Sequence, residues 1–173
     1  MTNFADYIAA AHTNVKEANV KRLATMISRS RNEHVAAQID CYADATTNDA
    51  IYTNEKIVNM HYSAVYDKTK LADSNLFAML CTIDAHVAAK RSTITKRALS
   101  ATLMSIDYKA LDADTQRIVH RSERHDDKTD TQTNYCIAAL KRMSVLTLDS
   151  VTKCFKINAD AKALQIVRDA VSQ

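Results

Sequence analysis

The sequence predicts a compact, mainly all-α domain of six to eight helices spanning residues 1–173, with one β-hairpin expected near 145–157. Three observations predict this fold class. Apolar residues recur at helical spacing through most of the chain, alanine is abundant, and glycine and proline are both absent. At average usage a chain of this length contains roughly 12 Gly and 9 Pro. Glycine and proline are the residues that most often interrupt a helix, so the absence of both favours a helical fold.

The composition also excludes several classes of site. A hydrophobic fraction of 47% and a charged fraction of 25% are ordinary for a folded protein. Phosphate-binding loops, dinucleotide-binding fingerprints and nucleophile elbows all depend on glycine, so a chain with no glycine contains none of them. Its turns must instead be made by Asn, Asp, Ser and Thr.

The first third of the chain predicts two or three helices. Helices are expected to begin near Asn3 and at Asn14, where Glu17 completes a cap-like pairing. Residues 30–33, Ser-Arg-Asn-Glu, form a capping box. Two alternatives follow: a new helix begins at this box, or one unbroken helix continues to about Ala45.

The middle of the chain predicts three further helices. After a polar break at residues 46–49, one helix carries apolar positions at helical spacing: Ile51, Val58, Tyr62 and Val65. The next helix is capped by Asp73 or Ser74 and has the clearest core stripe, formed by Leu76, Leu80, Ile83 and Val87. A third helix is expected to start at residues 91–93, with Leu99, Leu103 and Ile106 in register.

The last third predicts helix, helix, hairpin and helix. Asp112 caps a helix to about His125, a polar loop covers residues 126–130, and a helix capped by Asp130 or Thr131 runs to Met143. The apolar period then changes from helical to alternating. Residues 145–148 and 151–157 are predicted strands around a turn at 149–150, and residues 160–171 close the chain as a helix.

Positive charge is concentrated in one segment. Residues 92–156 contain 11 basic and 8 acidic residues, whereas residues 1–91 contain 10 of each. Within this segment Arg117, Arg121 and Arg124 are spaced i, i+4 and i+7, so a helix would place them on one face. This pattern indicates a polyanionic partner.

Residues 93–157 resemble a winged-helix module, in which helices are followed by a hairpin. The helix at 131–143 corresponds to its recognition helix, and such modules commonly have glycine where this chain has Ser144. The resemblance implies contact with nucleic acid. The expected phosphate contacts are Arg117, Arg121, Arg124 and Lys128, the expected base contacts are Gln132, Asn134, Lys141 and Arg142, and the expected wing contacts are Lys153 and Lys156.

The predicted function is therefore a non-enzymatic binding protein, without a cofactor, that contacts nucleic acid through this region. The alternative is a helical structural or assembly protein, viral or cellular, that binds a protein partner or a second copy of itself. Tyr52, Tyr62 and Tyr66 share one predicted helix, where they suit either the edge of a core or an interface. An enzyme of unrecognised type is the third hypothesis.

Metal binding and covalent catalysis have no local signature. The six histidines lack metal-ligand spacing, and the four cysteines, Cys41, Cys81, Cys136 and Cys154, are far apart and expected to be reduced. The first residues lack the basic and apolar regions of a signal peptide. No apolar run approaches the roughly 20 residues that span a bilayer. We therefore expect a cytoplasmic protein without a membrane partner.

Overall fold

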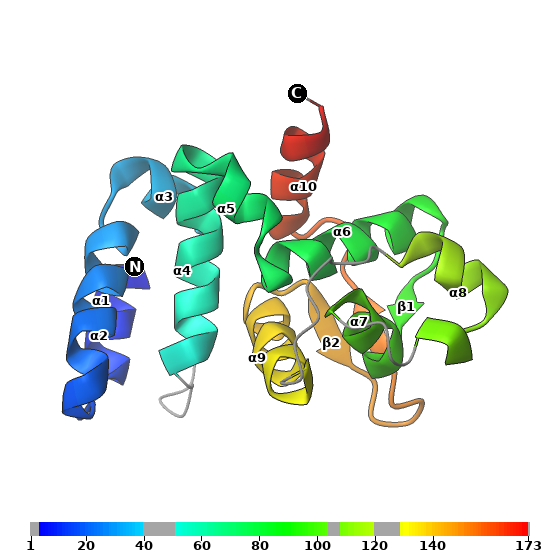
Figure 1. The fold of residues 1–173 in the computed structure, drawn as a ribbon, viewed down its shortest axis with the longest axis horizontal. Helices are drawn as coiled ribbons and strands as arrows, with labels where there is room; N and C mark the ends of the chain where they lie inside the picture. Colours follow the sequence, from blue (N-terminus) through cyan, green and yellow to red (C-terminus); the bar gives the residue numbers. More distant parts are fainter. Residues whose placement is uncertain (1–3, 40–50, 104–107, 120–128, 173) are drawn as a thin grey trace. The chain divides into compact units, whose positions relative to one another are not determined.

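The computed structural model describes residues 4–39, 51–103, 108–119 and 129–172, and it is mainly helical (Figure 1). Within these residues it contains ten α-helices and one three-stranded antiparallel sheet, which confirms the predicted fold class. The chain divides into two compact units, residues 1–71 and 72–173, here named the N-terminal unit and the C-terminal unit.

The N-terminal unit is built from helices packed around α2. Its elements are α1 (Phe4–Ala11), α2 (Glu17–Ser30), α3 (Glu33–Gln38) and α4 (Ile51–Tyr66), and α5 (Lys68–Ala72) begins at its end. Helix α2 packs against α1, α3 and α4. The side chains excluded from water between these helices include Ile8, Met26, Val35, Ile57 and Val58. Helix α5 was not predicted from the sequence.

The boundary between α2 and α3 decides between the two alternatives for residues 30–45. Helix α2 ends at Ser30, and a new helix begins at Glu33. The cap is Asn32, whose side chain accepts hydrogen bonds from the backbone N–H of His34 and Val35. Ser30 is buried and donates to Met26 O instead. The predicted cap at Asn14 is wrong, because α2 starts at Glu17.

The predicted tyrosine cluster lies along the contact between α2 and α4. Arg22 stacks over the Tyr52 ring, 4.5 Å from its centroid, and pairs with Glu55 at 3.1 Å. Seven residues further along α2, about two helical turns, Arg29 stacks over the Tyr62 ring at 4.6 Å. These cation–π contacts place the two rings at the edge of the interface between helices.

Replacing Arg22 with alanine is expected to lower the free energy of unfolding by about 1 kcal/mol, because a cation–π contact and a part-exposed ion pair are lost together. Urea denaturation of the full chain measures this change. Lys21→Ala removes the same charge from an exposed neighbouring position and is expected to change stability by less than about 0.5 kcal/mol. Equal effects of the two substitutions would show that the Tyr52 contact contributes nothing.

Most of the other elements of the C-terminal unit pack around helix α6 (Asn75–Ala88). The cap of this helix is Ser74, one of the two residues predicted for that position. After α6 come β1 (Thr93–Ile94), α7 (Lys96–Leu103), a 3₁₀ turn (Tyr108–Ala110), α8 (Ala113–Ile118), α9 (Thr129–Arg142), β2 (Leu146–Leu148), β3 (Phe155–Ile157) and α10 (Ala163–Val171). Helix α6 contacts α7, α8, α9, α10 and β1. Its predicted stripe is buried at Leu76, Leu80 and Ile83.

The sheet has the strand order β1-β3-β2, with both pairs antiparallel. Ile94, Phe155 and Leu146 are buried, whereas Thr93, Lys156 and Thr147 are exposed, so the sheet has one covered face. Strand β1 lies where a helix start was predicted, at residues 91–93. That prediction is wrong because Thr93 and Ile94 pair with β3, a partner more than 60 residues away. Helix α7 starts after Thr95, whose hydroxyl oxygen accepts from Ala98 N at 3.1 Å.

The chain makes left-handed turns without glycine. Lys90, Ser144 and Lys153 have φ values of 58°, 56° and 58°. Lys90 and Ser144 each follow the end of a helix in a Schellman motif. At the end of α6, Arg91 N donates to His86 O and Lys90 N to Val87 O, both at 2.9 Å. At the end of α9, Val145 N and Ser144 N make the equivalent bonds to Leu140 O and Lys141 O.

Candidate nucleic-acid interface

Helix α9 presents a polar stripe opposite its buried face. Cys136, Ala139, Leu140 and Met143 are buried against the core of the unit. Asn134 and Lys141, seven residues apart, are both exposed on the other side, and Arg142 is half-buried beside them. Gln132 is half-buried and faces away from Asn134, because two residues rotate a helix by roughly 200°. Three of the four predicted base contacts therefore share one accessible side.

The hairpin after α9 carries the two predicted wing lysines. Lys153 is exposed in the connecting loop, and Lys156 is exposed on β3, where it pairs with Asp149 at 3.4 Å. The loop is longer than the predicted turn at 149–150, because it runs from Leu148 to Phe155. Val151, predicted to lie in the second strand, is in this loop and 87% exposed.

Asp149 organises the loop. Its Oδ1 accepts from Val151 N at 2.9 Å and Thr152 N at 3.2 Å, and its backbone N donates to Cys154 O at 2.9 Å. These backbone donors, together with Lys156, hold the pKa of the Asp149 carboxyl below its usual range. Because the loop is closed by several hydrogen bonds, Lys153 is displayed from an ordered hairpin.

The predicted arginine helix ends early. Helix α8 begins after the expected cap, Asp112, but it stops at Ile118, and Val119 is extended with φ −75° and ψ 117°. The prediction of one unbroken helix from 112 to 125 is therefore wrong at Val119, and residues 120–125 of that prediction lie outside the described residues. Val119 is buried in this extended conformation, so tertiary packing overrides the weak helical preference there.

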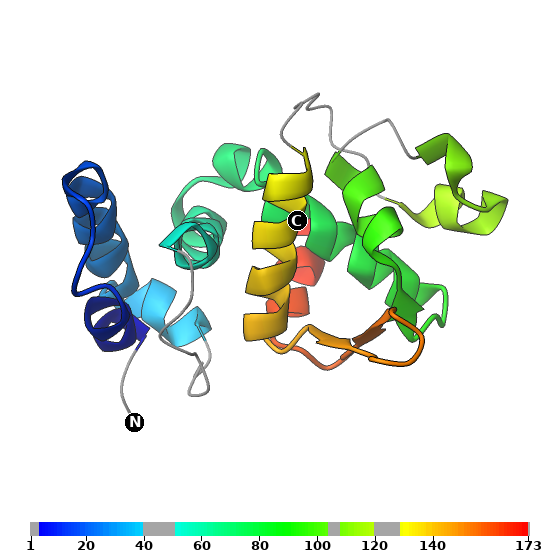
Figure 2. The same ribbon diagram turned by 90° about the horizontal axis from the view of Figure 1, so that it is seen from below.

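The predicted arginine stripe requires one continuous helix from Arg117 to Arg124, and the extended Val119 interrupts that helix. Arg117 is exposed and pairs with Asp114 at 3.3 Å. Arg121, Arg124 and Lys128 lie outside the described residues. In Figures 1 and 2, α7 lies between α9 and α8, the helix that carries Arg117.

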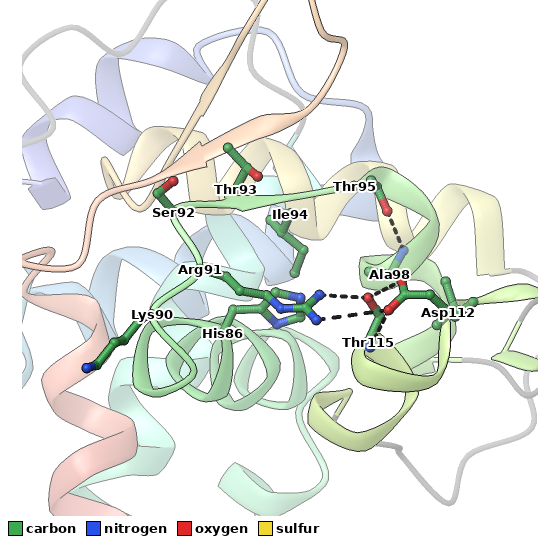
Figure 3. Close-up of a pocket in the computed structure, with 11 residues that line it drawn as sticks. His86, Lys90, Arg91, Ser92, Thr93, Ile94, Thr95, Ala98, Asp112 and Thr115 are labelled. Atoms are coloured by element: carbon green, nitrogen blue, oxygen red, sulfur yellow. Dashed lines mark hydrogen bonds and ion pairs between the residues drawn. The ribbon is translucent and has the colours of Figure 1, made fainter.

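A polar pocket of about 420 Å³ lies at the corner between α6, β1 and the start of α8 (Figure 3). Arg91 Nη1 donates to Thr115 Oγ1 at 2.9 Å, and Thr115 donates its hydroxyl and its backbone N–H to the Asp112 carboxylate. These bonds hold the pKa of Asp112 below its usual range. The sequence did not predict this pocket, because its lining residues come from two separate stretches, 86–98 and 111–115, that share no local motif.

The described residues offer little for metal or thiol chemistry. They contain no group of three or more His, Cys, Asp or Glu side chains that could hold a metal ion. Burial, with a smaller contribution from Asp84, raises the pKa of the Cys81 thiol to about 11, which disfavours the reactive thiolate. Cys136 is fully buried. None of the described helices has the length and apolar character that crossing a bilayer requires.

Comparison of the chain with protein-family models, curated proteins and solved structures finds no match. The assignment of function therefore depends on geometry and chemistry alone. Within the described residues, the largest grouping of the predicted contact residues is the one on α9 and the hairpin that follows it: Asn134, Lys141, Arg142, Lys153 and Lys156.

Proposed function

We propose that the protein is a non-enzymatic nucleic-acid-binding protein that uses α9 and the β2–β3 hairpin as one interface. The observation that carries this proposal is the exposed polar stripe of α9 leading directly into an ordered hairpin that carries Lys153 and Lys156. Both elements belong to the C-terminal unit, and α9 contacts β2.

The order of elements supports a winged-helix arrangement for this unit. Helix α6, strand β1, helix α7, helix α9 and the β2–β3 hairpin follow one another, with α8 inserted before α9, and β1 pairs with β3 to give the order β1-β3-β2. Ser144 adopts at the corner between α9 and β2 the left-handed conformation that glycine commonly takes. The absence of glycine at that corner is therefore compatible with the arrangement.

The chemistry of the interface favours backbone contacts over base recognition. Lys141, Arg142 and Lys153 can neutralise phosphates, which gives affinity without sequence information. Asn134 is the residue on the exposed stripe best suited to a base edge, since an Asn amide can pair with adenine. Lys156 is already paired with Asp149, so it contributes less positive charge to a ligand. We therefore expect binding of low sequence preference and strong salt dependence.

The double substitution Lys141→Ala/Arg142→Ala is expected to weaken binding to duplex DNA by roughly tenfold or more at low salt. It should also reduce the salt slope by about 2, because two phosphate contacts are lost. Fluorescence anisotropy with duplex DNA, single-stranded DNA and RNA over a range of salt concentrations measures both quantities and identifies the preferred ligand.

Lys109→Ala/Lys162→Ala is the matched control, because it removes the same charge from exposed positions of the same unit outside α9 and the hairpin. The control is expected to bind within about twofold of the unmodified protein at moderate salt, where distant charges are screened. Absence of binding at low salt, or equal losses in both variants, would rule out the proposed interface.

A specific observation also favours the alternative function, assembly through protein contacts. Val20, Tyr52 and Tyr66 are 53%, 40% and 48% exposed on α2 and α4 of the N-terminal unit. Exposed tyrosines are enriched in protein interfaces. Light scattering over a concentration series tests self-association: a monomer at all concentrations would exclude a homo-oligomer.

A further inference from the structure

Arg91 connects the corner between α6 and β1 to the start of α8. The Schellman bonds at Lys90 and Arg91 fix the backbone at this corner. From there the guanidinium donates to Thr115 Oγ1 at 2.9 Å, and its Nη2 lies 4.0 Å from Asp112 Oδ1 and 3.9 Å from Asp114 Oδ2. One side chain from the corner thus contacts three residues in the cap and first turn of α8.

Helix α8 depends on such contacts. It is six residues long, and an isolated helix of that length is unstable in water. The Asp112 cap satisfies its first turn, and Tyr108 donates to Gln116 O at 2.7 Å from the preceding turn. The hydrogen bond from Arg91 to Thr115 links α8 to the α6–β1 corner. Loss of the Arg91 contact should therefore loosen α8 locally.

His86 lies under this link. His86 is 2% exposed and lines the same pocket as Arg91, Asp112 and Thr115 (Figure 3). Its Nδ1 lies 2.9 Å from Thr82 O, and this carbonyl can only accept, so Nδ1 carries the hydrogen of the neutral ring. A second proton must therefore be added at Nε2. The resulting positive charge would be buried beside the Arg91 guanidinium.

The charges of Arg91 and Asp112 both act on His86. Burial lowers the pKa of His86 most, the Arg91 charge lowers it further, and the hydrogen bond to the Thr82 carbonyl and the Asp112 charge oppose the shift. Lys90 lines the pocket as well, but its side chain points away from the ring in Figure 3. Asp114 pairs with Arg91. The local balance disfavours a charged imidazole while Arg91 is in place.

We infer that His86 and Arg91 form a pH-sensitive latch, which holds α8 at the α6–β1 corner and is released when His86 binds a proton. The protonated ring repels the guanidinium, which can move toward solvent and give up its bond to Thr115. The latch shares no residue with the proposed nucleic-acid interface on α9 and the β2–β3 hairpin.

The direction of the pH effect follows from the linkage between proton binding by His86 and the stability of the latch. Burial and the Arg91 charge hold the pKa of His86 below the unfolded value of 6.5. Release of the guanidinium removes the Arg91 contribution, so the released state binds the proton more tightly than the latched state. Latch stability is therefore complete above about pH 6.5 and falls as the pH drops below that value. The loss continues until the pH reaches the lowered pKa of the latched ring.

Amide hydrogen exchange of the full chain at pH 7.5 and 5.5, corrected for intrinsic exchange rates, tests the latch. Protection of the α8 amides relative to those of α10 is expected to fall about threefold or more at the lower pH. In His86→Asn the difference should disappear, because the Asn amide can still donate to Thr82 O but does not titrate. His34→Asn, a change at an exposed histidine of α3, should retain the full difference.

An equal pH effect in His86→Asn, or no effect in the unmodified protein, would overturn the latch. A second measurement does not depend on the folding of any variant. The NMR titration midpoint of the His86 ring in the unmodified protein must coincide with the midpoint of the change in α8 exchange. A clear separation of the two midpoints would also overturn it.

Discussion

Replacing Leu140 with alanine is expected to lower the free energy of unfolding by about 2–5 kcal/mol, as for other leucines removed from closely packed cores. Leu140 is fully buried on α9, the helix that packs against α6, α7 and β2. Its loss removes the transfer free energy of the side chain and leaves a cavity bounded by elements that cannot all collapse together.

Urea denaturation followed by circular dichroism measures this effect, and the aromatic near-ultraviolet signal reports the packing. Lys141→Ala changes the next residue of the same helix, which is exposed, and is expected to change stability by less than about 0.5 kcal/mol. A loss below about 1 kcal/mol for Leu140→Ala would show that α9 is not packed into the core as described.

The parts of the fold that the sequence predicted depend on neighbouring residues. Ser74 and Asp112 were predicted caps, and each accepts a hydrogen bond from the N–H three residues on. The core stripe of α6 follows from an apolar spacing of three and four. The hairpin follows from the change to alternation after Met143. All of these signals are contained within one or two turns.

The parts that were missed depend on distant partners. Strand β1 forms because Thr93 and Ile94 meet β3, and no local pattern distinguishes them from a helix start. Helix α8 ends at Ile118 because Val119 is buried in an extended conformation. The pocket at Arg91 combines α6, β1 and α8. Packing between separate elements decides each of these features, and the periodicity of the sequence does not reveal which elements will pack together.

The residues of the candidate interface also fall into those that the local sequence pattern predicts and those that depend on distant contacts. Asn134, Lys141 and Arg142 could be predicted, because the buried face of α9 identifies the opposite face as accessible. The arginine stripe could not, because its spacing has meaning only if one helix continues through Val119. The pairing of Lys156 with Asp149 also required knowledge of the loop conformation.

The absence of glycine has a measurable energetic consequence at Lys90 and Ser144. A residue with a Cβ in the left-handed conformation is disfavoured by roughly 1–2 kcal/mol. Glycine avoids that penalty but loses more conformational entropy on folding, by roughly 0.5–1 kcal/mol. Lys90→Gly and Ser144→Gly are therefore each expected to raise the free energy of unfolding by about 0.5–1 kcal/mol, and the two together by about 1–2 kcal/mol.

Thermal and urea denaturation of the single and double variants measure this gain. The two sites lie at the ends of different helices, so their effects should add. Lys141→Gly is the opposing control: it introduces glycine three residues before Ser144, inside α9, where it should cost about 1 kcal/mol. If Ser144→Gly destabilised the protein as Lys141→Gly does, the left-handed corner between α9 and the hairpin would be contradicted. A gain at Ser144 with a loss at Lys141 is the result expected when the helix ends between these two residues.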